Sequence, residues 1–153
     1  MDVNTLFKEK GKDFKLELLA GSDGLNRKIT MRDLNRPGLA FAGFFEHFPY
    51  KRVQVIGLSE YEYLIRLSYD VQVEILSRIF SNRDAVCCIL TRGFKPTGAM
   101  IKVFTGLKVP LLRTEFVFSS LMGDLAYYFD GKLASSIKMH GVLTSVYGLG
   151  ILF

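Results

Sequence analysis

The spacing of apolar residues changes near Pro49 and divides the chain into an irregular first third and a regular remainder. In the first third, Val3, Leu6 and Phe7 recur on one face of a helix, and Gly11 ends it. The other elements expected there are a strand at 16–19, a turn at 21–24, a second short strand at 27–30 and an extended or turning segment around 37–38.

Beyond Pro49, short apolar runs alternate with segments of helical period. The continuous apolar run from Ala85 to Leu90 is typical of a strand that is buried on both faces. Val71, Ile75 and Ile79 form one row of a helix for which Ser68 is a suitable N-cap. The expected strands are 52–56, 85–90 and 109–112, and the expected helices begin near Ser59, Ser68, Gly98 and Phe118, the last one ending at Gly131.

This order of strands and helices predicts an α/β fold, a parallel sheet with flanking helices. The last stretch breaks the rhythm, because residues 136–146 and 150–153 are expected to form two strands of a β-hairpin. A hairpin that ends on an apolar strand indicates the start of another domain. We therefore expect an α/β domain at 1–134 and the first strands of a truncated second domain at 135–153.

Charge and composition narrow the function classes. The formal net charge is +5 and the pI about 9.2, but Lys and Arg are scattered among Asp and Glu. Without a basic run or a recognition-helix pattern, we expect no nucleic-acid partner. No apolar run reaches the roughly 18–20 residues that span a bilayer. The N-terminus lacks a basic region followed by an apolar core, so we expect no membrane association and a cytoplasmic location.

The two cysteines, Cys87 and Cys88, are adjacent within the apolar run that starts at Ala85. Neighbouring residues on a strand point to opposite faces, so these thiols are expected to be buried and unpaired. With only two His in the chain, no metal site is expected.

Four segments in the same order carry a resemblance to a known family. They are 34–39 (Leu-Asn-Arg-Pro-Gly-Leu), 90–93 (Leu-Thr-Arg-Gly), 109–114 (Val-Pro-Leu-Leu-Arg-Thr) and 139–152, which begins Met-His-Gly-Val-Leu. Together they resemble HPr kinase/phosphorylase, from its N-terminal signature to the strands that precede its phosphate-binding loop. The chain departs from the family at Asn35, where Ser is common, and at Ser145, where Asp is common.

The larger departure is that the pattern Gly-x-x-x-x-Gly-Lys-Ser/Thr does not occur in the sequence. That loop holds ATP phosphates through backbone N–H groups and a Lys, and Mg²⁺ through a hydroxyl. By resemblance it would begin within a few residues after Phe153, so we expect the kinase core to be missing and the fragment to be inactive without it.

The resemblance implies the activity of the whole enzyme. It phosphorylates a serine of HPr, the phosphocarrier of the sugar phosphotransferase system, and removes the phosphate with inorganic phosphate, which regulates carbon metabolism. It requires ATP and Mg²⁺ and usually assembles as a hexamer through its kinase domain; no cofactor is expected on this fragment. The family's N-terminal domain is similar in fold to the uridine-nucleotide-binding domain of a cell-wall Mur ligase.

By the same resemblance, His140 matches the family's active-site His, which lies close to the phosphate-binding loop. Imidazole titrates near neutral pH, so a His there could orient or protonate a phosphoryl oxygen. The residues alone leave open that His140 only ends a strand.

Arg92 and Arg113 each follow an expected strand. In a parallel sheet both lie at the carboxyl edge, where open α/β sheets bind ligands, and they could hold a small anionic effector. The alternative is that both are ordinary surface arginines near turns.

Two other hypotheses for the function of the chain stay open. One is a stand-alone module that senses a small ligand, and the other is a scaffold that only positions the catalytic oligomer. The aromatic residues of 41–50 are expected to pack in the core or at a domain contact, with a partner-binding patch as the alternative, and His47 has no assigned role.

Overall fold

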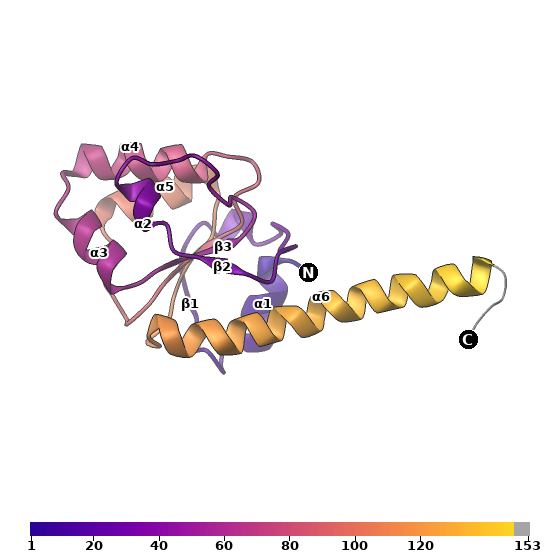
Figure 1. Ribbon diagram of the computed structural model, residues 1–153. Helices are drawn as coiled ribbons and strands as arrows, with labels where there is room; N and C mark the ends of the chain where they lie inside the picture. Colours follow the sequence, from indigo (N-terminus) through magenta and orange to yellow (C-terminus); the bar gives the residue numbers. More distant parts are fainter. Residues whose placement is uncertain (149–153) are drawn as a thin grey trace.

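The computed structural model describes the backbone of residues 1–148 and the side chains of residues 1–134. A five-stranded sheet runs through it in the order β1-β5-β4-β3-β2 (Figure 1). Neighbouring strands are parallel except β1, which pairs antiparallel with β5 at one edge. The strands are β1 (Glu17–Ala20), β2 (Leu34–Asn35), β3 (Val53–Ile56), β4 (Cys88–Leu90) and β5 (Leu111–Arg113).

Helices cover both faces of the sheet. On one face lie α2 to α5, and on the other lie α1 and the first turns of α6 (Figure 1). The helices are α1 (Val3–Lys10), α2 (Gly38–Phe41), α3 (Leu58–Ile65), α4 (Tyr69–Phe80), α5 (Gly98–Leu107) and α6 (Phe118–Gly148), with a 3-10 turn at Ser22–Gly24. The predicted α/β fold with three central parallel strands is confirmed.

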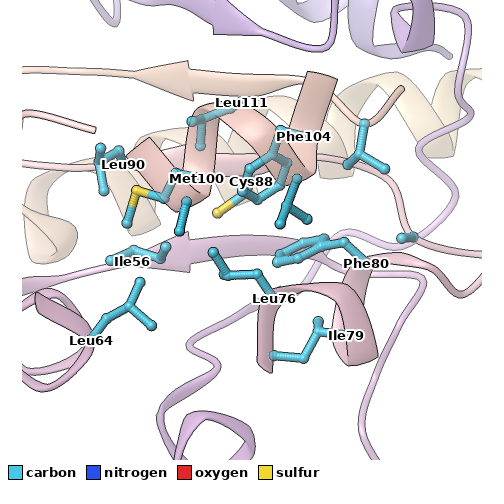
Figure 2. Packing of buried hydrophobic residues seen from close by; sticks show 14 of the residues in the cluster. Ile56, Leu64, Leu76, Ile79, Phe80, Cys88, Leu90, Met100, Phe104 and Leu111 are labelled. Atoms are coloured by element: carbon cyan, nitrogen blue, oxygen red, sulfur yellow. The ribbon is translucent and has the colours of Figure 1, made fainter. Parts of the chain in front are cut away.

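The alternation of side chains along each strand divides the core into two clusters. In β4, Cys88 and Leu90 pack against α4 and α5, whereas Ile89, and Cys87 just before the strand, face α1 and α6. Figure 2 shows Cys88 beside Phe104 on the first of these faces. The adjacent cysteines are therefore buried, unpaired and on opposite sides of the sheet, as expected from the period of a strand.

Of the two helix starts predicted from serine caps, one is confirmed and one is wrong. Ser68 accepts a hydrogen bond from Val71 N at 3.3 Å and begins α4, as predicted. The prediction that Ser59 begins the preceding helix is wrong, because the N-cap of α3 is Gly57. The Glu60 carboxylate accepts a hydrogen bond from Gly57 N at 2.7 Å, which fixes the start of the helix two residues earlier.

The strand expected at 27–30 is also wrong, since only an isolated bridge between Asp2 and Lys28 forms.

The chain after Gly131 differs most from expectation. The predicted helix end at Gly131 and the predicted strand at 136–146 are both wrong, because α6 continues to Gly148. A strand there would need a partner for its backbone groups, whereas a helix satisfies them internally. No proline interrupts the segment, and each internal glycine costs only about 1 kcal/mol. The strand expected at 150–153 lies outside the described residues, so the hairpin has no support within them.

Candidate functional site

The carboxyl ends of β2 to β5 meet at one edge of the sheet, and the loops that leave them bring distant residues together. The loops begin after Asn35, Ile56, Leu90 and Arg113. In an open parallel sheet this edge is the usual place for a ligand. We call this region the carboxyl edge.

A strained turn carries Arg92 at the carboxyl edge. Phe94 N donates to the Thr91 carbonyl at 3.1 Å, and both central residues of this turn have positive φ, 56° at Arg92 and 63° at Gly93. Such turns favour Asn-Gly, because a long side chain in the left-handed region is strained. The strained arginine is exposed. Backbone strain of this kind is common at functional positions.

The turn is fastened to the loop between β5 and α6. Arg92 N donates to the Phe116 carbonyl at 2.9 Å, and Gly93 N donates to the Thr114 carbonyl at 2.8 Å. The fully buried hydroxyl of Thr91 donates to the Ile56 carbonyl at 2.8 Å and ties the same turn to β3. Three strands therefore fix the direction of the turn that presents Arg92.

Arg113 reaches the same edge but is occupied by other groups. Its Nε and Nη2 donate to Oε2 of Glu17 at 3.1 and 2.7 Å, and its Nη1 donates to the Phe94 carbonyl at 3.4 Å. This fork holds the antiparallel edge strand β1 to β5 and to the turn after Arg92. The structure thus brings both predicted arginines to the carboxyl edge, with Arg113 in a cross-link and Arg92 projecting from it.

An ion pair between a partly exposed arginine and a buried carboxylate lies at the other end of this edge. Oε1 of Glu60, whose side chain is 7% exposed, accepts from Arg36 Nε at 2.9 Å as well as from Gly57 N. The Arg36 guanidinium also lies over the Phe118 ring, 4.6 Å from its centroid. Arg36 therefore links β2 to the starts of α3 and α6. Sequence reasoning missed Glu60, although its position three residues after Gly57 fits a capping box.

Two aromatic rings close the edge between these groups. Tyr61 and Phe94 stack with centroids 4.1 Å apart and an interplanar angle of 2°, and the Tyr61 hydroxyl donates to the Lys95 carbonyl at 2.8 Å. The stack joins α3 to the loop after Arg92. The carboxyl edge thus presents one exposed cation, Arg92, beside two partly exposed stacked rings, and the cation could attract an anion.

His140 lies apart from this edge. Its backbone belongs to α6, which begins beside the carboxyl edge at Phe118 and continues past the other elements (Figure 1). The residue is 22 positions along the helix from Phe118. At 1.5 Å per residue, this places it roughly 33 Å from the carboxyl edge. The structure therefore does not bring His140 together with Arg92 and Arg113.

The buried thiols are poor candidates for chemistry. Burial raises the pKa of Cys87 to about 12 and that of Cys88 well above its ordinary value. The thiol is the inert form, and deprotonation is disfavoured at both positions. Among the residues that the structure describes, no three His, Cys, Asp or Glu side chains are grouped so that they could hold a metal ion. In the same part of the chain, no helix is both long and apolar enough for a bilayer.

The five-stranded, mostly parallel sheet with helices on both faces defines an α/β domain, and comparison gives its family. The model of the HPr Serine kinase N terminus matches residues 1–129. The chain belongs to this family.

Relatives named HPr kinase/phosphorylase support the assignment. The proteins of Halalkalibacterium halodurans, Exiguobacterium sibiricum and Bacillus cytotoxicus are 35%, 34% and 37% identical over 139, 140 and 139 residues. These alignments cover 91%, 92% and 91% of this chain but 44%, 45% and 45% of the relatives. The chain thus spans less than half the length of the relatives that it matches.

Comparison with solved structures gives a distant match. The CBS and DRTGG domains of the regulatory region of Clostridium perfringens pyrophosphatase, complexed with diadenosine tetraphosphate, superpose with a TM-score of 0.49 at 13% identity. The match covers 82% of this chain and 50% of that chain. The expected likeness to a Mur ligase domain stays a prediction.

Proposed function

We propose that the chain is the N-terminal domain of a bifunctional HPr kinase/phosphorylase. The complete protein would transfer the terminal phosphoryl group of ATP to a serine of HPr. In the reverse direction it would transfer that group from the serine to inorganic phosphate, which releases the hydroxyl and forms pyrophosphate. The observation that carries this proposal is the family match over residues 1–129, together with relatives of that name at 34–37% identity.

The residues of this chain do not fit ATP and Mg²⁺. The phosphate-binding pattern Gly-x-x-x-x-Gly-Lys-Ser/Thr is absent from its 153 residues. The described part also lacks a group of three or more possible metal ligands. The proposal therefore assigns both groups, and the assembly into a hexamer, to the part of the relatives that this chain does not match. A cytoplasmic location, where HPr and ATP meet, is part of the same proposal.

A direct test incubates the complete protein with HPr, ATP and Mg²⁺ and measures HPr by mass spectrometry. We expect one phosphoryl group on a serine of HPr. Adding inorganic phosphate after removal of ATP should return HPr to its original mass and generate pyrophosphate. Unmodified HPr in the first reaction, with the protein folded, contradicts the proposed function.

His140 is the one residue of this chain to which the proposal gives a catalytic role. In the complete protein, His140→Ala is expected to lower turnover in both directions by about 10²–10⁴-fold, the usual contribution of one positioned acid or base. The unfolding midpoint should change far less than turnover, because the proposed role of His140 is chemical and not structural. The neighbouring Lys138→Ala is the control and should keep wild-type turnover. Wild-type turnover of His140→Ala would make the residue structural.

Ligand sensing is a second candidate function, and the turn at Arg92 favours it. A strained arginine that projects from a turn held by three strands is positioned for contact with an anion rather than for packing. The two functions are compatible, since a sensing domain can precede a kinase domain in one protein. If a small anion changes the activity of the complete protein to the same extent in the wild type and in Arg92→Ala, then Arg92 has no part in ligand sensing.

A further inference from the structure

A concave region lies at the amino-terminal edge of the sheet, opposite the carboxyl edge. Two cavities of about 290 and 340 Å³ meet there and share Lys51 and Asp84 in their linings. They lie where the chain enters β3 and β4, whereas Arg92 lies beyond the opposite end of β4. We call the two cavities together the amino-edge groove.

The first cavity is strongly basic. Arg27, Lys28, Lys51 and Arg83 line it, opposed by the single carboxylate of Asp84. The side chains of Lys51 and Arg83 are exposed, and neither forms an ion pair with any side chain that the structure describes. Several like charges at one concave site repel each other, so an anion would be attracted there.

Arg27 gives this cavity a rigid floor. Its Nε and Nη2 donate to the carbonyls of Lys108 and Leu107 at 2.9 and 3.2 Å, and its Nη1 donates to the Ala85 carbonyl at 2.7 Å. These bonds anchor the loop before β2 to the end of α5 and to the loop before β4. The guanidinium keeps its positive charge while its position is fixed, so it contributes a permanent field to the cavity.

The second cavity has an aromatic wall. Phe48 and Tyr50 meet edge to face with ring centroids 4.8 Å apart, and both are partly exposed. The buried amide of Gln54 donates to the carbonyls of Pro49 and Arg52 at 3.0 and 3.1 Å, which fixes the loop that carries the rings. A flat apolar group can therefore pack on a wall that is already in place.

Arg52 is a further cation of the second cavity. It lines the aromatic cavity, and its Nε is buried without a hydrogen-bond partner among the described residues. A buried donor of this kind is rare and costs free energy until a partner or a counter-charge is near. Arg52 thus adds a cation with an unpaired donor to the lining of the aromatic cavity.

We infer that the amino-edge groove binds a small organic phosphate that carries a flat apolar group. The phosphate would lie among Lys51, Arg83 and the fixed Arg27, and the apolar group would pack against Phe48 and Tyr50. This inference goes beyond the proposed function and needs neither HPr nor ATP, so it stands or falls without the kinase assignment.

Phenyl phosphate is a suitable probe because it joins the two parts in the smallest form. Titration of the 153-residue chain, followed by calorimetry and by backbone amide NMR shifts, should show binding tighter than that of inorganic phosphate. Benzoate, which carries a single negative charge on the same ring, should bind more weakly. Raising the salt concentration should weaken the binding, since the cations are near the surface.

Charge variants test the position of the site. Lys51→Glu and Arg83→Glu should each weaken phenyl phosphate binding by at least about tenfold, because attraction is replaced by repulsion. Asp84→Asn removes the one opposing carboxylate and should tighten binding several-fold. Lys102→Glu makes the same charge change at an exposed position of α5 and is the matched control, expected to leave the affinity within about twofold.

Tyr50→Leu tests the aromatic wall, and it should reduce the advantage of phenyl phosphate over inorganic phosphate. Circular dichroism of each variant shows that it is folded. The inference is overturned if phenyl phosphate does not bind the folded chain, or if Lys102→Glu weakens it as much as Lys51→Glu. It is also overturned if Asp84→Asn leaves the affinity unchanged or if benzoate binds equally well.

Discussion

Replacing Glu60 by Ala should destabilise the domain more than any other single change at an acidic residue of α3. The side chain is 7% exposed, and one of its oxygens accepts hydrogen bonds from both Gly57 N and Arg36 Nε. Alanine removes the cap at the start of the helix and leaves the guanidinium of Arg36 without its carboxylate.

The magnitude follows from these two contacts. Loss of the helix cap costs about 1 kcal/mol. The ion pair adds about 1 kcal/mol rather than the larger value of a fully buried pair, because the Arg36 side chain is 39% exposed and can be hydrated. The γ-methylene of Glu60, the one methylene that alanine lacks, contributes about a further 0.8 kcal/mol. We therefore expect a loss of about 2–3 kcal/mol.

Glu60→Gln separates charge from hydrogen bonding. The amide oxygen can still accept from Gly57 N, so this variant should lose only about 1 kcal/mol. Glu62→Ala is the matched control on the same helix, since Glu62 is exposed, and it should change the stability by less than about 0.5 kcal/mol. Urea unfolding followed by circular dichroism measures all three. Equal stabilities of Glu60→Ala and Glu62→Ala would refute the role given to this ion pair.

Two further predictions concern the strained turn and the first helix. Arg92→Asn should stabilise the chain by about 0.5–1 kcal/mol, because Asn tolerates the left-handed region that Arg92 occupies. The control Lys95→Asn, in the same loop at negative φ, should not stabilise it. Thermal unfolding measures both variants, and a loss of stability in Arg92→Asn would contradict the backbone strain inferred at position 92. Asp2 accepts hydrogen bonds from Thr5 N and then Thr5 Oγ1, both at 2.8 Å, which lower its pKa below 3.8. A lowered folded-state pKa gives stability that is present above the unfolded-state value and lost as the pH falls through the folded-state value. Asp2→Ala should thus lower the free energy of unfolding by about 1 kcal/mol at neutral pH. The difference in stability between the wild type and Asp2→Ala should narrow as the pH falls below 3.8. A difference that does not depend on pH would be inconsistent with this cap.

The fold was predictable where the pattern of the sequence is local. The run from Ala85 to Leu90 could be assigned to a buried strand because both faces of β4 need apolar side chains. Ser68 could be assigned as a cap because the cap acts on residues of its own helix. The end of α6 could not be predicted, since no local signal decides between a helix and a strand whose partner lies elsewhere.

The sites depend on contacts between distant residues, and this limits what the sequence shows. Arg113 is the last residue of β5, at the edge where open sheets bind ligands, but its partner Glu17 lies 96 positions away on an antiparallel strand. The amino-edge groove likewise combines three loops, around Lys28, Lys51 and Arg83, in which each cation alone resembles an ordinary surface residue. Their convergence is a property of the sheet and not of any one segment.

The most direct test of the account compares the 153-residue chain with the complete protein in one HPr phosphorylation assay. Each is incubated with HPr, ATP and Mg²⁺ at the same concentration, and HPr is then analysed by mass spectrometry. The account predicts seryl-phosphorylated HPr with the complete protein and unmodified HPr with the chain alone, because the chain contains no phosphate-binding loop. Clear phosphorylation of HPr by the purified 153-residue chain would contradict it.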